Sequence, residues 1–515
     1  MSKSIPIESL EMKKDSSQDS STSNTTYSNE IPRPSIIDEE EKINHQPPLS
    51  SSSQTATTTT PIDPDDDPNI NGGYAWVILA CIFTISCCSW GGNSSFAVYF
   101  AYYETHNLYP TATVIDFAAI GGITFGVGIF CAPVINYISG KITPKGSLII
   151  GNICQFLALF ITSFDSHNQL WQLYLTQGVL QSFGLAFLGM PSFTILPLWF
   201  QNKGNKEDYS LKRRMLTFSQ SIMAAGTGGG GLLFNLGMQK VIQVYGLRWA
   251  LRTQSFITLF CVSISIFFLK DKSKKVKVEF TMFDKDVFFF PAFWGNVFFV
   301  MFTMFGYVVT LYSLADWTIS LGYTEYQGSV VAGMISLGII IGRPALGIAA
   351  DRFGAILIAI FSTFLTIIFV LAMWIPSRNY ASALALGVFL GAFSGVIFVC
   401  MTSINILVID FRMNKMNVTF SMGAIVLGAS AVVSPIIGLS LQKSLPSPTQ
   451  YVYCSAFVGA AYFAALVDLI ILRGFLISVK EIQTPGLTDK EYFSLRPKVS
   501  RILRNSLKLT NVGWL

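Results

Sequence analysis

Residues 379–409 read NYASALALGVFLGAFSGVIFVCMTSINILVI and contain no Asp, Glu, Lys or Arg. A helix that crosses the hydrocarbon core of a bilayer needs about 20 apolar residues, with a range of about 17–25. This segment is long enough, and eleven further charge-free windows are as well. They cover 68–103, 117–140, 146–164, 166–202, 215–239, 253–269, 287–315, 326–342, 355–377, 416–442 and 444–467. The windows predict an all-α membrane protein with twelve transmembrane helices.

The composition agrees with this class. Among 515 residues, 51% are hydrophobic and 13% are charged, whereas a soluble domain carries about 25% charged residues. The long windows also exclude a β-barrel, whose strands show alternating segments of about 10 residues. A soluble enzyme and a nucleic-acid-binding domain are excluded on the same grounds. We therefore expect the lipid bilayer, and no nucleic acid, as a partner.

The cysteines and other reactive side chains indicate neither catalysis nor metal binding. All eight cysteines fall inside the apolar windows, without a C-x-x-C pair or a His-rich stretch. This arrangement predicts neither a disulfide framework nor a metal site. The sequence shows no nucleophile–base pair either. We expect that the protein is not an enzyme and binds no cofactor or metal.

The basic residues predict the orientation in the membrane. Loops on the side of the two termini carry sixteen Lys and Arg residues, whereas the opposite loops carry four. Cytoplasmic loops carry the excess of positive charge, so both termini are predicted to be cytoplasmic. The most charged loop, 270–287, is predicted to be a cytoplasmic linker between two six-helix halves, 74–269 and 288–478.

The two ends of the chain differ from the membrane part. Residues 1–73 are rich in Ser and Thr and carry too little apolar surface to offset the entropy of ordering, which predicts a disordered cytoplasmic tail. Lys13 and Lys14 beside several serines indicate a site for kinase or ubiquitin machinery, with a plain solvated tail as the alternative. Residues 479–515 form a basic cytoplasmic tail, in which 498–509 projects as an amphipathic helix. That helix is predicted either to lie on an anionic leaflet or to be solvated.

A weak internal repeat supports the division into halves. Residues 121–135 read GGITFGVGIFCAPVI and residues 332–346 read AGMISLGIIIGRPAL, at an offset of 211 positions. The same offset aligns Lys141 with Arg352. Two parallel six-helix halves are the architecture of major-facilitator carriers.

A loop motif follows the eighth window. Residues 347–354 read GIAADRFG, which resembles the G-x-x-x-D-R-x-G loop of the major facilitator superfamily. The resemblance implies that small residues let two helices approach, while Asp351 and Arg352 latch a cytoplasmic gate. We therefore expect the major facilitator fold.

Two further segments narrow the resemblance to one family. Residues 71–76 read NGGYAW and resemble the D/E-G-G-aromatic-G/A-W signature of monocarboxylate transporters. Residues 199–200 (WF), together with the run AAGTGGGG at 224–231, resemble the second signature of that family. Over 74–478 the chain resembles the fungal Mch branch of the monocarboxylate transporter family.

The mechanistic charges of that family are largely replaced. Arg343 matches the substrate-binding Arg, but Ser94 stands where proton–lactate carriers have an essential Lys. Ile339 stands where they have an Asp, four residues before Arg343. Since two of three charges are lost, the resemblance argues against proton coupling of the lactate type.

The residues predict a site at the middle of the bundle. Arg343 should face the interior, because a charge at helix depth costs about 2.5–3.5 kcal/mol on insertion scales, and its guanidinium suits a carboxylate or another planar acceptor. A structural latch to a neighbouring helix is the alternative. The sequence at 90–95 (WGGNSS) interrupts the first apolar helix and brings Asn93 and Ser94 to the cavity. Tyr307 and Gln181 are predicted to converge there, or else to join helices.

Two acidic residues lie near the outer helix ends. Asp316 and Asp116 are candidates for gating or proton binding, with a wet or helix-capping role as the alternative. Asp316 and Arg343 differ in depth by roughly 20 Å at 1.5 Å per residue, so they should not pair.

Together these features predict a secondary transporter of a small organic solute that works by alternating access, similar to monocarboxylate transporters. The alternatives are a facilitative carrier of another solute, such as a flavin, and a nutrient sensor that does not transport. The resemblance favours the plasma membrane, with the vacuolar membrane as the alternative.

Overall fold

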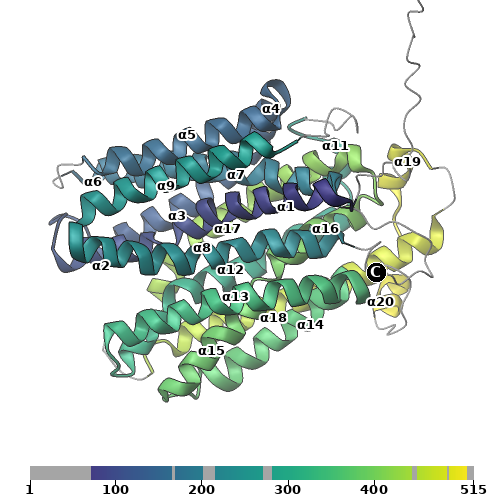
Figure 1. Cartoon of the computed structure of the whole chain (residues 1–515). Coiled ribbons are helices and arrows are strands. Elements are labelled where there is room, and N and C mark those ends of the chain that lie inside the picture. The colour runs from purple at the N-terminus through teal and green to yellow at the C-terminus, as the bar shows by residue number, and fades with distance from the viewer. Residues whose placement is uncertain are drawn as a thin grey trace, which may run out of the picture. The chain divides into compact units, whose positions relative to one another are not determined.

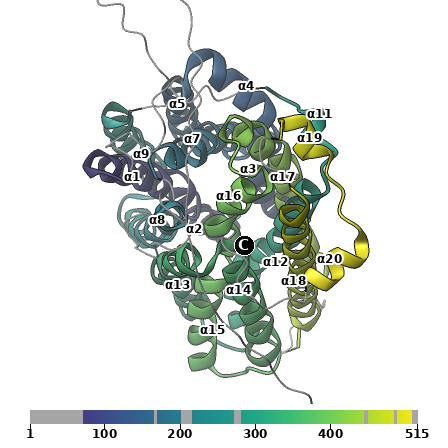
Figure 2. The ribbon, with the colours of Figure 1, turned by 90° about the vertical axis from the view of Figure 1, so that its right-hand side faces the viewer.

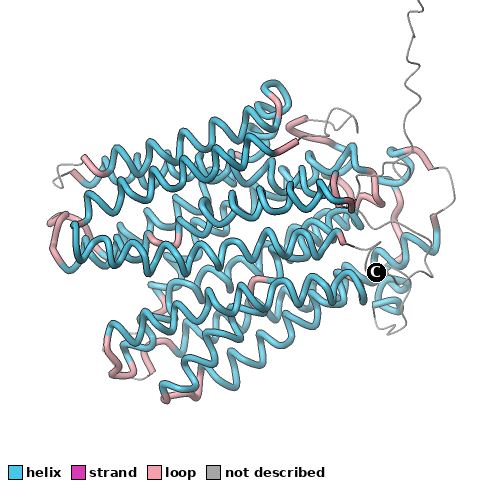
Figure 3. The backbone as a smooth tube through the Cα atoms, viewed as in Figure 1, coloured by secondary structure: helices cyan, strands magenta, loops and turns pink. Residues whose placement is uncertain are grey.

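The structure is a computed structural model that describes residues 71–164, 169–200, 215–270, 281–442, 449–483 and 487–506. All of them fall within one unit, Ile62–Leu515. The predicted tail with Lys13 and Lys14, most of the predicted linker and the last nine residues lie outside the described part of the chain. Every regular element in the described part is a helix (Figure 3).

The helices form two consecutive sets. The first set is α1 (Gly73–Ser86), η2 (Cys87–Gly91), α2 (Phe96–Thr105), α3 (Val114–Phe130), α4 (Ala132–Ile142), α5 (Pro144–Thr162), α6 (Leu170–Leu173), η3 (Tyr174–Leu180), α7 (Gln181–Ile195), η4 (Leu196–Leu198), α8 (Leu216–Tyr245) and α9 (Leu247–Phe268). The second set is α11 (Lys285–Phe288), α12 (Pro291–Ser320), α13 (Glu325–Phe353), α14 (Ala355–Phe369), η6 (Val370–Trp374), α15 (Tyr380–Phe393), α16 (Val396–Val408), η7 (Met413–Lys415), α17 (Met416–Ser440), α18 (Val452–Ile482), α19 (Asp489–Ser494) and α20 (Val499–Ser506).

The long helices are apolar enough to cross a membrane. Among the described residues, ten helical segments pass a test of length and hydropathy, and α3 with α4, bent by 53°, adds an eleventh if the pair is one span. These segments confirm the prediction of a multi-pass, all-helical membrane protein. Helix α8 has 30 residues but lies outside this set, since its glycine run lowers the hydropathy.

The weak repeat in the sequence has a counterpart in the backbone. Thr143, which ends α4 and precedes α5, has φ 77° and ψ 150°. Gly354, which ends α13 and precedes α14, has φ 102° and ψ 138°. The two residues are 211 positions apart, so the same left-handed turn occurs at matching places in the two sets. A positive φ favours glycine, which explains the last residue of the loop motif.

Two glycine-lined seams join the sets. Helix α3 packs on α17, and α8 packs on α13 (Figure 1 and Figure 2). A Cβ on Gly126 would lie 2.5 Å from the carbonyl oxygen of Gly428, and a Cβ on Gly228 would lie 2.7 Å from that of Ser336. Small residues allow membrane helices to approach closely. Each seam therefore brings the backbones of the two sets into contact.

The segment after α18 packs on the end of the second set. Tyr492 and Phe493 of α19 are buried, and both rings lie against Phe290. Arg412, which follows α16, binds Asp489 at 2.7 Å. This segment belongs to the same end of the bundle as α11.

A candidate solute-binding cavity

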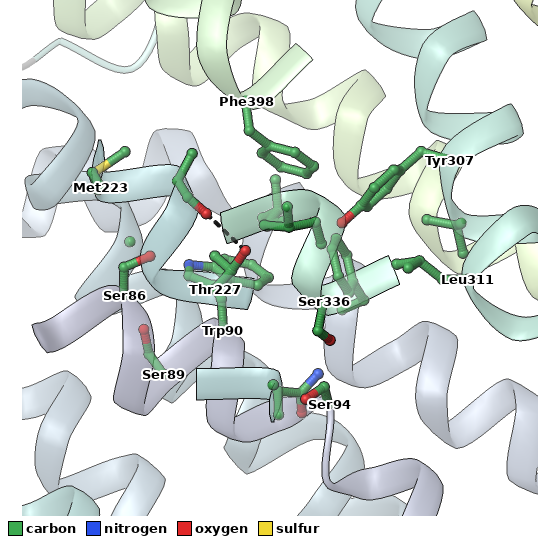
Figure 4. Close-up of a pocket in the computed structure, with 18 of the residues that line it drawn as sticks. Ser86, Ser89, Trp90, Ser94, Met223, Thr227, Tyr307, Leu311, Ser336 and Phe398 are labelled. Carbon is green, nitrogen blue, oxygen red and sulfur yellow. Dashed lines mark hydrogen bonds between the residues drawn. The ribbon is translucent and has the colours of Figure 1, made fainter. Parts of the chain in front are cut away.

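A cavity of about 200 Å³ lies between the two sets of helices. Helices α1, α2, α3, α7 and α8 contribute lining residues from one set, and α12, α13, α16 and α17 contribute them from the other. Eight aromatic rings form much of the wall: Trp90, Phe96, Phe125, Phe193, Tyr307, Tyr312, Phe398 and Phe420. Tyr307 and Phe398 lie across the cavity from Ser94 (Figure 4). The cavity is thus largely apolar, with a few polar groups.

The interruption of the first apolar helix borders this cavity. A π-helical segment, Cys87–Gly91, is followed by a turn at Ser94 and Ser95 before α2 begins. Asn93 and Ser94 line the cavity. The Ser94 hydroxyl donates to the Gly91 carbonyl at 2.6 Å, so the broken helix satisfies its own backbone locally.

Gln181 reaches the cavity through a neighbour. It is buried, and its Nε2 donates to Asn93 Oδ1 at 3.3 Å. Asn93 lines the cavity, whereas Gln181 stands behind it. The amide of Gln181 therefore orients Asn93.

Arg343 is held in the cavity wall by neutral partners. Its side chain is 1% exposed, and Nη1 donates to the Ala224 carbonyl at 2.8 Å and to Thr227 Oγ1 at 2.9 Å. Nη2 donates to the Tyr307 hydroxyl at 3.0 Å, and the guanidinium carbon lies 5.0 Å from the centre of the Phe398 ring. Because Ala224 and Thr227 belong to α8, Arg343 of α13 bridges the two sets.

One donor of the guanidinium has no partner. Arg343 Nε is buried and has no hydrogen-bond partner. Gly395 lies beside this edge, where a Cβ would be 2.5 Å from Nη2 and 3.0 Å from Nε. Of the five N–H donors of an arginine, those on Nε and one Nη form a planar fork that matches a carboxylate. Gly395 packs against this edge, and its lack of a side chain lets α16 come close to the guanidinium.

The charge of Arg343 has no acidic counterpart in the cavity. Among the described lining residues, it is the one that is charged at neutral pH. Ile339 and Ser94, at the positions where proton–lactate carriers have Asp and Lys, both line the cavity. An uncompensated buried cation favours an anionic ligand, because removing a charge from water is costly unless it is paired.

Asp351 joins the two sets at a different level. Its side chain is buried and accepts hydrogen bonds from the backbone N–H groups of Thr217 at 2.9 Å and Phe218 at 2.7 Å. These are the first-turn donors of α8, where a helix favours negative charge. Arg352 next to it is exposed and lies over the Phe353 ring, with the guanidinium carbon 5.7 Å from the ring centre.

The other two acidic candidates lie away from the cavity. Asp116 caps α3 in a reciprocal box with Thr113, and Tyr174 donates to its Oδ1 at 3.1 Å. Asp316 lines a separate pocket of about 60 Å³ that also contains Tyr312. The structure thus brings Arg343, Tyr307, Asn93 and Ser94 together, but not the carboxylates at 116 and 316.

The comparison with known families agrees with this geometry. A family model described as Major Facilitator Superfamily matches residues 79–435. The chain belongs to the Major Facilitator Superfamily. Proteins of this superfamily that resemble the chain are named as transporters, which points to a transporter rather than an enzyme.

Several curated relatives share most of the membrane part. "Probable transporter MCH2" of Saccharomyces cerevisiae is 38% identical over 80% of this chain and 85% of its own length. "Uncharacterized transporter ESBP6" of the same yeast is 29% identical over 82% of this chain, which spans 62% of that relative. "MFS transporter asaE" of Aspergillus flavus is 23% identical over 80% of this chain and 90% of its own length. The predicted resemblance to the fungal Mch branch of this superfamily is confirmed.

Some residues at this cavity were not predicted from the sequence. Thr227 sits within the glycine run 224–231, where its hydroxyl is the one polar side chain, and that contrast could have marked it. Phe398 and Gly395 lie inside the charge-free window 379–409. No local pattern distinguishes these two from helix-packing residues, because their role follows from where α16 crosses Arg343.

Proposed function

We propose that the protein is a secondary transporter of a small organic monoanion, which it moves by alternating access of the central cavity. One observation carries the proposal: Arg343 is buried in the cavity with its Nε unpartnered and with no acidic lining residue in the described part of the chain. A carboxylate of the cargo would complete the coordination of Arg343 and neutralise its charge.

The dimensions and lining of the cavity support a small cargo. A volume of about 200 Å³ is below the roughly 300–1,000 Å³ of pockets that enclose drug-sized ligands. The aromatic wall favours an apolar body attached to the anionic group. These two properties support a monocarboxylate more than a flavin.

The topology belongs to the same proposal. Counting α8 as a span gives twelve transmembrane helices, arranged as two six-helix halves with both termini in the cytoplasm. The excess of Lys and Arg in the loops on the side of the termini supports this orientation. We assign the protein to the plasma membrane on the family resemblance.

The two glycine-lined seams are the contact surfaces along which the halves would move. Rocking of one half on the other would open the cavity to each side in turn, as in carriers built from two parallel halves. Asp351 would act as the cytoplasmic latch, since it holds the first turn of α8 to α13. Asp316 and Asp116 stay candidates for gating or proton binding on the outer side of the membrane. Asp116 is engaged in the N-terminal cap of α3.

Exchange assays on the purified protein in liposomes test the function. Liposomes loaded with unlabelled solute would be mixed with labelled lactate, pyruvate, benzoate or riboflavin, beside a screen of a metabolite extract. We expect exchange of at least one monocarboxylate and none of riboflavin. Exchange of riboflavin alone would show a flavin carrier. Exchange of no solute from the panel or the extract would support the sensor and contradict transport.

A further inference from the structure

Helix α20 packs on the last part of α18. A Cβ on Gly474 of α18 would lie 2.6 Å from the carbonyl oxygen of Ile502, so this glycine lets the two backbones touch. Asn505 is fully buried, and its Nδ2 donates to Ser478 Oγ at 2.9 Å and to Glu481 Oε2 at 3.0 Å. The position of α20 is therefore fixed by backbone contact and by a buried amide.

The docked helix leaves two apolar side chains uncovered. Val499 is 70% exposed and Leu503 is 56% exposed, although Ile502 packs on the core. At about 100° per residue, Val499 and Leu503 lie on one flank of the helix, roughly 120–160° from the buried Asn505. The apolar flank formed by Val499 and Leu503 thus faces away from the core of the protein.

The rest of the exposed surface of α20 is basic. The segment 498–506 reads KVSRILRNS and contains three cations, Lys498, Arg501 and Arg504, and no acidic residue. Lys498 and Arg504 are exposed and Arg501 is half-buried. The helix projection separates the two arginines from Val499 and Leu503. An amphipathic helix of this kind suits the boundary between acyl chains and anionic headgroups.

The location of α20 matches that boundary. It lies beside α18 at the edge of the bundle (Figure 2). The exposed apolar side chains of α18, among them Phe463, Val467 and Ile471, form the surface that a membrane would cover. Ile471 precedes Gly474 by three residues, so the docking site begins where this apolar surface ends.

We propose that α20 is an interfacial helix that binds anionic phospholipids of the cytoplasmic leaflet. Val499 and Leu503 enter the leaflet beside α18, and Lys498, Arg501 and Arg504 bind lipid phosphates. This contact extends the lipid-facing surface of α18. The positive charges of Lys498, Arg501 and Arg504 are complementary to the negative charges of the lipids. This inference rests on the membrane orientation proposed above, but not on any cargo.

Hydrogen exchange of the full-length protein in nanodiscs tests the proposal. The backbone amides of 499–506 would be compared in pure phosphatidylcholine and in a mixture with about 30% phosphatidylserine. We expect exchange at least about fivefold slower in the anionic discs, because each cation near an anionic surface strengthens binding by about that factor. One molar salt should remove the difference, since it shortens the screening length to about 3 Å.

Variants separate lipid binding from simple folding of the tail. Arg501→Gln with Arg504→Gln should abolish the difference between the two lipids, and Lys490→Gln, which removes an exposed cation of α19, should preserve it. Equal exchange in both lipids, or a difference that survives the double substitution, would overturn the proposal. The assay involves no transport step, so its failure would leave the proposed transport function standing, and a failure of transport would not affect its result.

Discussion

At the scale of single residues, the site depends on how Arg343 is left partly unsatisfied. Three neutral groups, from Ala224, Thr227 and Tyr307, hold the guanidinium, and they come from α8 and α12. The Nε donor is buried beside Gly395 and has no partner. A carrier must bind its cargo and also release it, so an arginine with one unpaired donor is better suited to cargo than a fully satisfied one.

Filling that edge should impair binding without removing the charge. In Gly395→Ala, the new methyl group would lie 2.5 Å from Nη2, so the guanidinium must shift from the position in which it would bind a cargo carboxylate. We expect solute exchange to fall roughly tenfold or more, because a hydrogen bond to a charged group contributes about 1.5–3 kcal/mol. Gly333→Ala is the matched control, since a Cβ there meets nothing within 4 Å. Equal exchange by both variants would show that the edge is not used.

Restoring an acid near Arg343 should create pH dependence. In Ile339→Asp, the new carboxyl lies one helical turn from Arg343, a spacing at which side chains on a helix meet. The ionised carboxylate would occupy the guanidinium in place of the cargo, and protonation would free it. Exchange should therefore rise as the pH falls, and Ile339→Asn should show no such rise. If the two variants share one pH profile, the carboxyl does not reach Arg343.

Part of the site could be predicted from the sequence, and part of it could not. Arg343, Tyr307, Asn93 and Ser94 are predictable because charge, polarity or a helix break makes them unusual inside apolar windows. Gly395 and Phe398 are not, because they differ from packing residues only through the crossing of α13 and α16. The loop motif predicts that Asp351 and Arg352 latch a gate, and the structure adds that Asp351 accepts hydrogen bonds from two backbone N–H groups of α8, which no side-chain pattern reveals.

At the scale of helices, the seams should tolerate little added volume. In Gly126→Ala, the added Cβ would lie 2.5 Å from the Gly428 carbonyl oxygen, so α3 and α17 must move apart. Overpacking typically costs about 1–3 kcal/mol, and we expect a lower melting temperature in detergent together with slower exchange. Gly237→Ala, where a Cβ meets open space, should be neutral or slightly stabilising. Equal melting temperatures would contradict a tight seam.

The helices themselves were largely predictable, and their exceptions have physical causes. Charge-free windows and turn residues locate most spans, including the break at 90–95. The bend of 53° between α3 and α4 and the docking of α20 on Gly474 depend on contacts between distant segments. Tertiary contacts of this kind leave no periodic signal in the chain.

At the scale of the whole molecule, the lack of an acidic residue among the described lining residues predicts the charge moved in each transport cycle. Among the described lining residues, none but Arg343 carries a charge at neutral pH, and Arg343 stays with the protein. A monoanionic cargo would then move alone and carry one negative charge per cycle. Uptake should be faster when the lumen of the liposome is held positive with a potassium gradient and valinomycin. An uptake rate that does not change with the membrane potential would indicate electroneutral coupling, for example to a proton.

The most direct test of the account asks whether Arg343 recognises the anionic group of the cargo. Exchange of a transported monocarboxylate and of its uncharged amide would be measured with the native protein, Arg343→Lys and Arg343→Gln, with Arg378→Gln, an exposed arginine, as the control. We predict that the native protein and the control prefer the carboxylate by about tenfold or more. Arg343→Lys should retain part of this preference, and Arg343→Gln should lose it. A carboxylate preference that persists in Arg343→Gln would contradict the central claim.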